Sequence, residues 1–325
     1  MLGIYFLGTS SGVPTKDRNV SGIAVLLPEA KSWVLVDCGE GTQQQILHSP
    51  LSLNSLEAIC ITHMHGDHCY GLPGLIASAG MSGRRTPLTV VGPKAVEEMY
   101  LAVAKCSDLH TPFEVNFVDS EALGSWSIGT TQIEAIALSH RVPSHAFSFA
   151  AKATRRTLLT DKLLADNVPR GPAWGRIQKG EPVKLESGET LQPESYVDQT
   201  EIARRMIVCG DNDRPDCLGS HIDQADVVIH EATYTESHLQ KIGPGPQHCS
   251  ALRIAGFAEK KKLPNLILTH FSPRFHTRSG AAHSIDDIEL EAREVYSGEL
   301  FIAEDHARYE LSETGELKLS SSASG

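Results

Sequence analysis

At 325 residues the chain is long enough for one large α/β domain or two medium ones. Its formal net charge of −11 argues against non-specific nucleic-acid binding by the whole surface, although a local basic patch stays compatible with it. The seven cysteines are odd in number and scattered without a CxxC pair, which argues against a disulfide framework. No apolar run approaches the roughly 18–20 residues of a membrane span. We therefore expect a cytoplasmic protein with reduced thiols and no membrane partner.

Short apolar runs rich in Val and Ile predict the strands, several of them buried on both faces. They lie at 2–8, 22–27, 32–37, 57–62, 88–91, 131–138, 206–209, 226–229, 264–269 and 299–303. The first of these runs lacks the basic start and small-residue cleavage site of a signal peptide. Helical patterns fall between the runs, at 40–48, 71–80, 93–105, 248–262 and 285–296. This alternation predicts layered α/β packing.

The stretch 151–198 interrupts the alternation, because it has four prolines, four glycines and little apolar periodicity. Its part from 151 to 184 carries eight basic and three acidic side chains in an otherwise acidic chain. We interpret 151–198 as an inserted arm between two halves of one domain, 1–150 and 199–312. The Ser-rich end, 313–325, is expected to be a disordered tail.

The strongest chemical signal is the cluster His63, His65, Asp67 and His68 directly after an apolar strand. In an extended segment His63 and His65 point to the same side and can bind one metal ion. Gly66 lets the chain turn, so that Asp67 and His68 face a second metal ion. Imidazole and carboxylate ligands suit Zn²⁺, with Mn²⁺ or Fe²⁺ as alternatives.

Two metal ions need further ligands, and three candidates also follow strand-like runs. These are His140, Asp211 and His270. Each stands where the end of a strand would bring it to the same rim of a sandwich. A lone histidine is more often a packing residue. We therefore interpret these three residues as metal ligands because they share this placement after strand-like runs.

The chain resembles the ribonuclease Z (tRNase Z) family of the metallo-β-lactamase superfamily, in its short bacterial-type form, from residue 1 to about 310. The family removes 3′ trailers from precursor tRNA. The matching motifs include FLGTSSGVPT at 6–15, DCGEGTQ at 37–43, HMHGDH at 63–68, HEAT at 230–233, HCS at 248–250 and THFSPR at 269–274. One departure is the loop 210–215, which is one residue longer than the usual pattern.

The resemblance implies an αβ/βα sandwich that holds two zinc ions per subunit. His63, His65 and His140 would bind one ion, Asp67, His68 and His270 the other, and Asp211 would bridge them. Asp67 would also orient the attacking water or accept its proton. His248 would protonate the leaving 3′ oxygen, and Glu231 would orient the imidazole of His248.

The resemblance also implies how the substrate is held. The residues expected to contact precursor tRNA are Arg18, Asn19, Arg274, Gly171 and Pro172. The last two belong to the basic arm, which resembles the base of the family's exosite, a protruding arm that grips the tRNA away from the cut. In family members the arm of one subunit serves the active site of its partner, so a homodimer is expected.

Two other readings remain open. The same zinc chemistry would serve a phosphodiesterase that acts on small diesters and has no role in tRNA processing. A catalytically silent, zinc-stabilised RNA-binding protein is the other, and it is disfavoured because such a protein has no need of Asp67, Asp211 and His248. Deletion of the arm separates the two enzyme readings, since only tRNA processing should depend on it.

Overall fold

The computed structural model describes residues 1–28, 31–185, 188, 190–278, 280 and 282–321. The chain divides into two compact units, and we describe each by itself. Unit 1 comprises Met1–Ala151 and Arg204–Gly325, and unit 2 comprises Lys152–Ala203. The strands β9 (Ser144–Leu158) and β12 (Val197–Cys209) each begin in one unit and end in the other.

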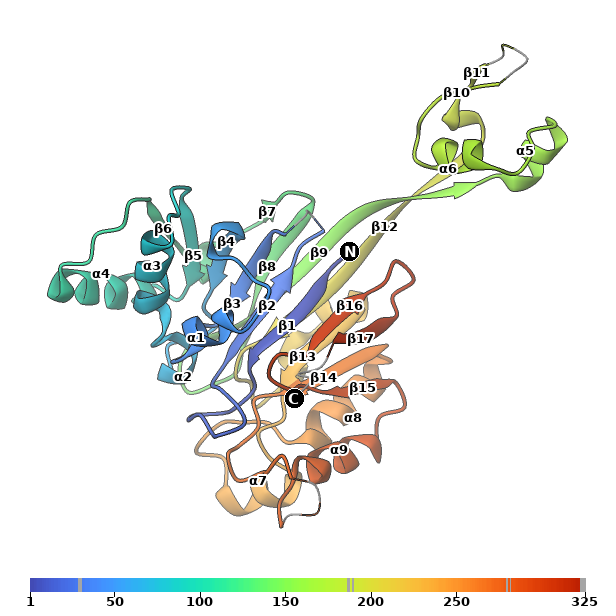
Figure 1. Cartoon of the computed structure of the whole chain (residues 1–325). Helices are drawn as coiled ribbons and strands as arrows, with labels where there is room; N and C mark the ends of the chain where they lie inside the picture. Colours follow the sequence, from blue (N-terminus) through green and yellow to red (C-terminus); the bar gives the residue numbers. More distant parts are fainter. Residues whose placement is uncertain (29–30, 186–187, 189, 279, 281, 322–325) are drawn as a thin grey trace. The chain divides into compact units, whose positions relative to one another are not determined.

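Unit 1 is built on two mixed sheets (Figure 1). The first has the strand order β17-β16-β1-β2-β3-β4-β5-β6 among the described residues, and β3 to β6 run parallel. Its strands are β1 (Gly3–Gly8), β2 (Gly22–Leu26), β3 (Trp33–Val36), β4 (Leu56–Cys60), β5 (Leu88–Gly92), β6 (Val115–Asp119), β16 (Arg308–Leu311) and β17 (Leu317–Ser321).

The second sheet has the order β15-β14-β13-β12-β9-β8-β7. Its strands β12 to β15 are parallel, whereas β7, β8 and β9 form an antiparallel meander. The strands not yet bounded are β7 (Trp126–Ile128), β8 (Thr131–Leu138), β13 (Val227–Glu231), β14 (Asn265–Thr269) and β15 (Glu299–Ile302).

The two sheets pack face to face around a shared apolar core. Ile4 and Phe6 of β1 lie in this core together with Val227 and Ile229 of β13. Because side chains alternate along a strand, the intervening residue Tyr5 belongs to a different cluster, on the outer face of the first sheet. Both faces of the central strands are therefore buried, which explains their continuous apolar runs.

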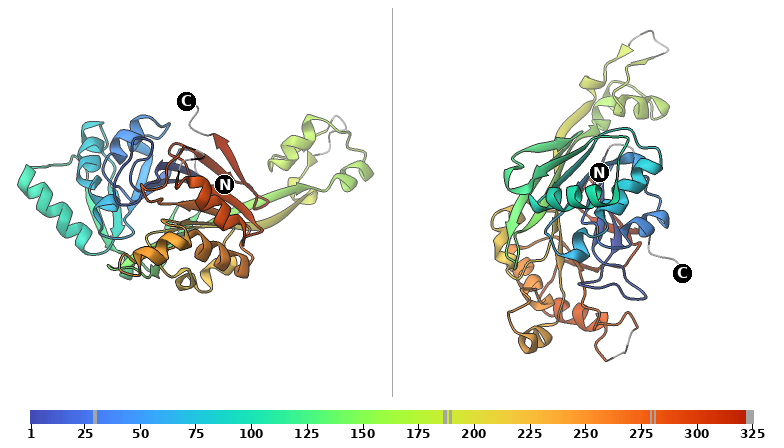
Figure 2. Two further views of the ribbon diagram at one scale, coloured as in Figure 1. Left: turned by 90° about the horizontal axis from the view of Figure 1, so that it is seen from below. Right: turned by 90° about the vertical axis from the view of Figure 1, so that its left-hand side faces the viewer.

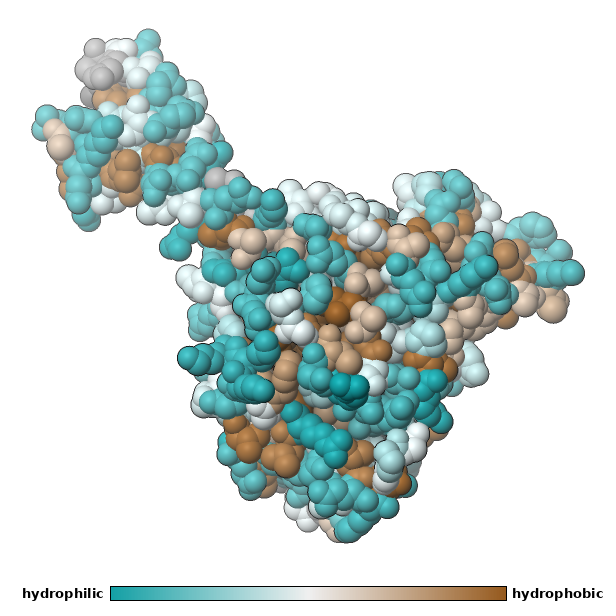
Figure 3. Space-filling view, turned by 180° about the vertical axis from the view of Figure 1, so that it is seen from behind, coloured by the Kyte–Doolittle hydropathy of each residue, from teal (hydrophilic) through white to brown (hydrophobic). Residues whose placement is uncertain are grey.

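Helices cover the outer face of each sheet (Figures 1 and 2). The first sheet packs against α1 (Thr42–Leu47), α3 (Leu72–Met81) and α4 (Ala95–Ser107). The second packs against α8 (Ala251–Lys261) and α9 (Ile285–Arg293), with α7 (Glu236–Ile242) beside α8. Unit 1 is thus the αβ/βα sandwich that the family resemblance implies. On the face drawn in Figure 3, hydrophilic residues are interspersed with smaller hydrophobic areas.

Unit 2 has a small core of its own. It contains α5 (Thr160–Ala165), α6 (Pro172–Gln178) and a hairpin of β10 (Val183–Lys184) and β11 (Thr190–Leu191). Leu163, Ile177 and Leu191 are buried against one another in this unit. Residues 151–198 therefore contain a packed apolar cluster, although their sequence shows little periodicity. The reason is that α5, α6 and the β10–β11 hairpin each contribute only one or two apolar side chains to it.

The C-terminal end corrects one prediction. Residues 317–321, expected to be part of a disordered tail, form β17 and pair antiparallel with β16. The reason is that β16 would otherwise be the edge strand, and Leu317 buries its side chain when β17 covers that edge. No helix within the described part of the chain is both long and apolar enough to cross a membrane.

Candidate metal centre and active site

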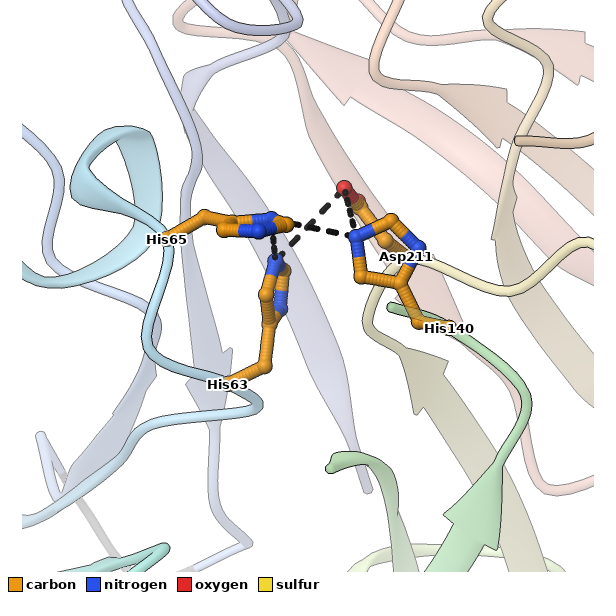
Figure 4. Close-up of side chains that lie close together, drawn as sticks. All are labelled: His63, His65, His140 and Asp211. Carbon is orange, nitrogen blue, oxygen red and sulfur yellow. Dashed lines mark hydrogen bonds and ion pairs between the residues drawn. The ribbon is translucent and has the colours of Figure 1, made fainter. Parts of the chain in front are cut away.

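The first group of candidate ligands gathers three histidines around one point. His63 and His65 lie in the loop after β4, and His140 follows β8. The Nδ1 atom of His65 is 3.1 Å from Nε2 of His63 and 3.0 Å from Nε2 of His140. Figure 4 shows these rings pointing toward one another and toward Asp211.

A second group lies beside it. His68, on the short helix α2 (Gly66–Cys69), has its Nε2 atom 3.2 Å from Nε2 of His270, which follows β14. Oδ2 of Asp67 is 3.4 Å from both of these nitrogen atoms. The backbone amide of Gly12 donates to the same oxygen at 2.7 Å, which fixes the carboxylate of Asp67.

Asp211 joins the two groups. It follows β12, and its Oδ2 atom is 3.6 Å from Nε2 of His63 and 3.6 Å from Nε2 of His140. Its Oδ1 atom is 3.4 Å from Nε2 of both His68 and His270. One buried carboxylate therefore presents one oxygen to each group, which is the arrangement of a bridging ligand.

These distances fit metal ions. Ligand atoms at about 2.0–2.1 Å from a tetrahedral ion lie about 3.3 Å from one another, and the separations in both groups are 3.0–3.6 Å. In each group, the imidazole nitrogens and carboxylate oxygens all lie within 4.8 Å of one another. The seven residues predicted from the sequence thus form buried clusters consistent with a binuclear metal site.

Further side chains orient these histidines from behind. Asp37 accepts a hydrogen bond from Nδ1 of His68 at 2.6 Å, and its other oxygen accepts from the amide of Thr62 at 2.8 Å. The carbonyl oxygen of Gln247 lies 2.8 Å from Nδ1 of His140. Such partners fix the tautomer that leaves the Nε2 lone pair for a metal ion. Sequence reasoning missed Asp37 in this role, although it follows the strand next to β4 in the sheet.

The ionisation of His63 and Asp67 suits metal binding. Burial lowers the pKa of His63, and the neighbouring His68, His140 and His65 lower it further. Burial alone would raise the pKa of Asp67, but His68 and His270 outweigh it and hold the pKa well below its usual range. A neutral imidazole and an ionised carboxylate are the forms that bind metal ions. Burial would lower the pKa of His68, but Asp211, Asp37 and Asp67 outweigh it and raise that pKa, so a metal ion has to displace a proton from His68.

His248 and Glu231 form a pair next to the clusters. Nδ1 of His248 is 3.0 Å from Oε2 of Glu231 and 3.6 Å from Oδ2 of Asp211. Burial would lower the pKa of His248, but the charges of Glu231 and Asp211 outweigh it and raise the pKa to about 9. Glu231 also accepts from the amide of Asn212 at 2.7 Å. Glu231 therefore holds the imidazole of His248 in place, and the charges of Glu231 and Asp211 favour its protonated form.

The residues expected to contact the substrate fall in three places. Arg18 is buried, and its guanidinium donates to the carbonyl of Phe275 at 2.6 Å. Asn19 is half-buried, and its backbone amide donates to the carboxylate of Asp305 at 2.6 Å. Arg274 is exposed, four residues beyond His270. Gly171 and Pro172 lie in unit 2, whereas the other three lie in unit 1.

The whole of unit 2 carries no net formal charge, although residues 151–184 are strongly basic. Residues 152–203 carry eight basic and eight acidic side chains, so that the formal charges cancel over the unit. Some of the basic residues are paired, such as Lys152 with Glu201 at 3.4 Å and Arg176 with Glu181 at 3.1 Å. Arg170 stacks over Trp174, with its Cζ atom 5.6 Å from the ring centroid. The positive charge is thus a feature of residues 151–184 alone.

Comparison with solved structures places this fold among known proteins. The crystal structure of human tRNase Z, short form, has a TM-score of 0.63 and 22% identity, over 95% of this chain and 99% of that one. A protein-family model described as Anti-Pycsar protein Apyc1 matches residues 2–167. The chain thus has the metallo-β-lactamase fold, and its histidine–aspartate centre is consistent with a binuclear metal site.

Curated relatives narrow the class. Ribonuclease Z of Pseudomonas putida strain W619 is 46% identical over 97% of this chain and 98% of its own length. Ribonuclease Z of Brevibacillus brevis is 34% identical over 90% of this chain and 92% of its own length. The chain belongs to the ribonuclease Z family, as the motifs in its sequence indicate.

Proposed function

We propose that this chain is an endoribonuclease that removes the 3′ trailer of precursor tRNA and leaves a 3′-hydroxyl on the tRNA. Family membership supports the substrate. The single structural observation that carries the chemistry is Asp211, whose two oxygens face two separate groups of metal-binding atoms. A purely structural site would need only one such group.

The proposed cofactor is two Zn²⁺ ions per subunit, with Mn²⁺ or another divalent ion as a possible replacement. His63, His65 and His140 would bind one ion, and Asp67, His68 and His270 the other, with Asp211 shared between them. Two ions held in this way lower the pKa of water and stabilise the charge of a phosphodiester during its hydrolysis.

The chain's own groups then supply position and protons. Asp67, held by the amide of Gly12, orients the attacking water or takes its proton. His248 carries a proton, which it delivers to the 3′ oxygen that leaves. Glu231 forms a hydrogen bond with Nδ1 of His248 and so leaves the other ring nitrogen, Nε2, for the substrate.

Recognition of the RNA is divided between the two units in this proposal. Asn19 and the exposed Arg274 contact the RNA near the cut, and Arg18 supports this surface by holding the carbonyl of Phe275 beside Arg274. Gly171 and Pro172 of unit 2 contact the tRNA away from the cut. The protein acts as a cytoplasmic homodimer.

The test is cleavage of a 5′-labelled precursor tRNA with a 3′ trailer, with mapping of the product end. We expect one cut directly after the base that precedes the trailer. The cut should be lost with a chelator, regained with Zn²⁺, and absent in Asp67→Ala. Asp108→Asn is the matched control, because Asp108 is an exposed residue at the end of α4.

An intact precursor, together with metal-dependent hydrolysis of bis(p-nitrophenyl) phosphate, would overturn the tRNA assignment. That result would favour the reading as a phosphodiesterase for small diesters. Loss of both activities in the zinc-loaded protein would instead favour the silent RNA-binding protein.

A further inference from the structure

The side chain of Asn212, the residue after the bridging carboxylate, is the centre of a buried hydrogen-bond network. Asn212 is 0% exposed and lies in the loop 210–215, which is one residue longer than the usual pattern of the family. Its contacts reach the loop that carries His140 in one direction and Glu231 in the other. The network therefore connects the metal centre with the pair formed by Glu231 and His248.

Two backbone amides fix the orientation of this side chain. Oδ1 of Asn212 accepts from the amide of Ser139 at 3.2 Å and from the amide of Arg214 at 3.3 Å. Since a backbone N–H can only donate, the oxygen lies on this side and the NH₂ group on the other. Nδ2 of Asn212 is 2.9 Å from Nε2 of His230. The side chain thus joins the loop before His140 to the end of β13.

The tautomer of His230 agrees with this orientation. Nδ1 of His230 lies 2.8 Å from the backbone carbonyl of Glu231, which can only accept, so Nδ1 carries a proton. Burial lowers the pKa of His230, which favours a neutral ring with Nε2 as the acceptor. Nδ2 of Asn212 therefore donates to Nε2. A continuous series of hydrogen bonds runs from the amide of Ser139 through Asn212 and His230 to the backbone of Glu231.

The backbone of Asn212 holds the side chain of the same glutamate. The amide of Asn212 donates to Oε1 of Glu231 at 2.7 Å, and a hydrogen bond to an ionised carboxylate is among the strong ones. Oε2 of Glu231 accepts from the hydroxyl of Thr233 and from the amide of Cys249. Nδ1 of His248 is 3.0 Å from the same oxygen. Asn212 therefore holds one oxygen of Glu231, and the other oxygen holds His248.

The metal ligands on either side of this network have further supports. The hydroxyl of Ser144 donates to the carbonyl of Asp211 at 2.9 Å, which fixes the backbone of the bridging ligand. Nδ1 of His140 lies 2.8 Å from the carbonyl of Gln247, which fixes its ring. Neither bond involves the side chain of Asn212. We therefore expect both ligands to keep their places when that side chain is removed.

We propose that Asn212 is a positioning residue that aligns the imidazole of His248 with the leaving 3′ oxygen, and that it acts through Glu231. The inference rests on the proposed function, in which His248 delivers a proton to that oxygen. The side chain of Asn212 keeps its own amide directed at Oε1 of Glu231 and fixes His230, the residue before Glu231. A carboxylate held in both ways gives the imidazole one position, and proton transfer requires that the donor stay within hydrogen-bond reach.

Asn212→Ala should lower kcat for precursor tRNA by about 10–100-fold with little change in KM, because a small misplacement of a catalytic group costs this much in rate. Hydrolysis of bis(p-nitrophenyl) phosphate and zinc content should stay unchanged, since nitrophenolate leaves without a proton. Asn265→Ala is the matched control. Asn265 is also buried, and its Nδ2 donates to the carbonyls of Asp226 at 2.8 Å and Gly315 at 3.0 Å. Its loss should destabilise the fold but leave kcat unchanged.

Two measurements separate positioning of the proton donor from general structural damage. The first uses a precursor whose leaving 3′ oxygen is replaced by sulfur, which leaves as a thiolate without a proton. The wild type and Asn212→Ala should cleave this precursor at similar rates. The second combines Asn212→Ala with His248→Ala, and the double variant should be no slower on the oxygen precursor than His248→Ala alone. His230→Leu breaks the same link and should behave like Asn212→Ala, which keeps the test available if Asn212→Ala does not fold.

Three results would overturn the inference. One is an unchanged kcat of Asn212→Ala on the oxygen precursor. Another is an equal loss on the oxygen and sulfur precursors, or a further loss in the double variant, since either would show an effect that does not pass through His248. The third is a fall in zinc content, which would place the role of Asn212 in the metal centre. Failure of the proposed function has a different signature, because the wild type would then cut neither precursor while it hydrolysed the small diester.

Discussion

At the scale of single residues, the centre depends on buried carboxylates that no solvent screens. Asp37 is almost fully buried and holds Nδ1 of His68 at 2.6 Å. It has a positive φ of 61°, which few residues other than Gly, Asn and Asp adopt easily. Its conformation and its charge are therefore both required where it lies. Glu231 has the corresponding position behind His248.

Asp37→Asn separates these two requirements, because Asn keeps the size and tolerates the backbone conformation. We expect metal affinity to fall by about 10–100-fold, since the charge that polarises His68 is lost. Titration with zinc against a competing chelator measures the affinity. An unchanged affinity would show that Asp37 serves only to shape the loop.

His248→Ala tests the proposed proton donor. Cleavage of precursor tRNA should slow by about 10²–10⁴-fold, because the 3′ oxygen is a poor leaving group without a proton. Hydrolysis of bis(p-nitrophenyl) phosphate should change little, since nitrophenolate leaves without one. Metal content is the control. Equal losses on both substrates would place His248 in another role.

At the scale of elements, the ligands are brought together by the ends of strands and by loops that touch backbone to backbone. The amide of Cys38 donates to the carbonyl of His68 at 2.7 Å, and the amide of Gly71 donates to the carbonyl of Cys38 at 2.9 Å. A Cβ atom on Gly39 would lie 2.2 Å from the carbonyl oxygen of Asp67. The loop after β3 therefore supports the loop that carries four of the ligands.

Gly39→Ala should push this support away from Asp67. We expect a loss of stability of roughly 1–3 kcal/mol and weaker metal binding, because the contact is with backbone atoms that cannot turn aside. Thermal unfolding with and without Zn²⁺ measures both effects. Gly256→Ala is the matched control, since a Cβ there meets nothing within 4 Å in the middle of α8 and should stabilise by about 0.5–1 kcal/mol.

At the scale of the whole molecule, the metal centre and unit 2 are separate compact parts of one chain. The residues of the centre all lie in unit 1. In the sequence, some of them precede and some follow the segment that forms unit 2. β9 and β12, which are neighbours in the second sheet, connect the two parts. Replacement of residues 152–203 by a short turn therefore leaves the ends of the sheet close enough to join.

This replacement should lower kcat/KM for precursor tRNA strongly and leave hydrolysis of bis(p-nitrophenyl) phosphate intact. Co-expression with Asp67→Ala then tests the proposed homodimer. If the arm of one subunit serves the site of its partner, the mixed dimer has one complete site, and tRNA cleavage returns. If each arm serves its own subunit, the mixture stays inactive on tRNA.

The sequence by itself determined the class of fold and the residues that form the two histidine–aspartate clusters. The strand runs at 131–138 and 264–269 match β8 and β14, and the residues predicted as ligands all lie in the clusters. Such signals are local, because burial on both faces and metal binding each impose a pattern on consecutive residues.

Only the tertiary structure decided which groups act behind the ligands and what covers the sheet edges. Asp37 meets His68 across 31 positions, and Gln247 meets His140 across 107. Residues 317–321 form β17 because β16 offers them an unpaired edge. Asn212 meets Ser139 across 73 positions and His230 across 18. Each of these contacts joins segments that are far apart in the chain, and no periodicity within either segment encodes its partner.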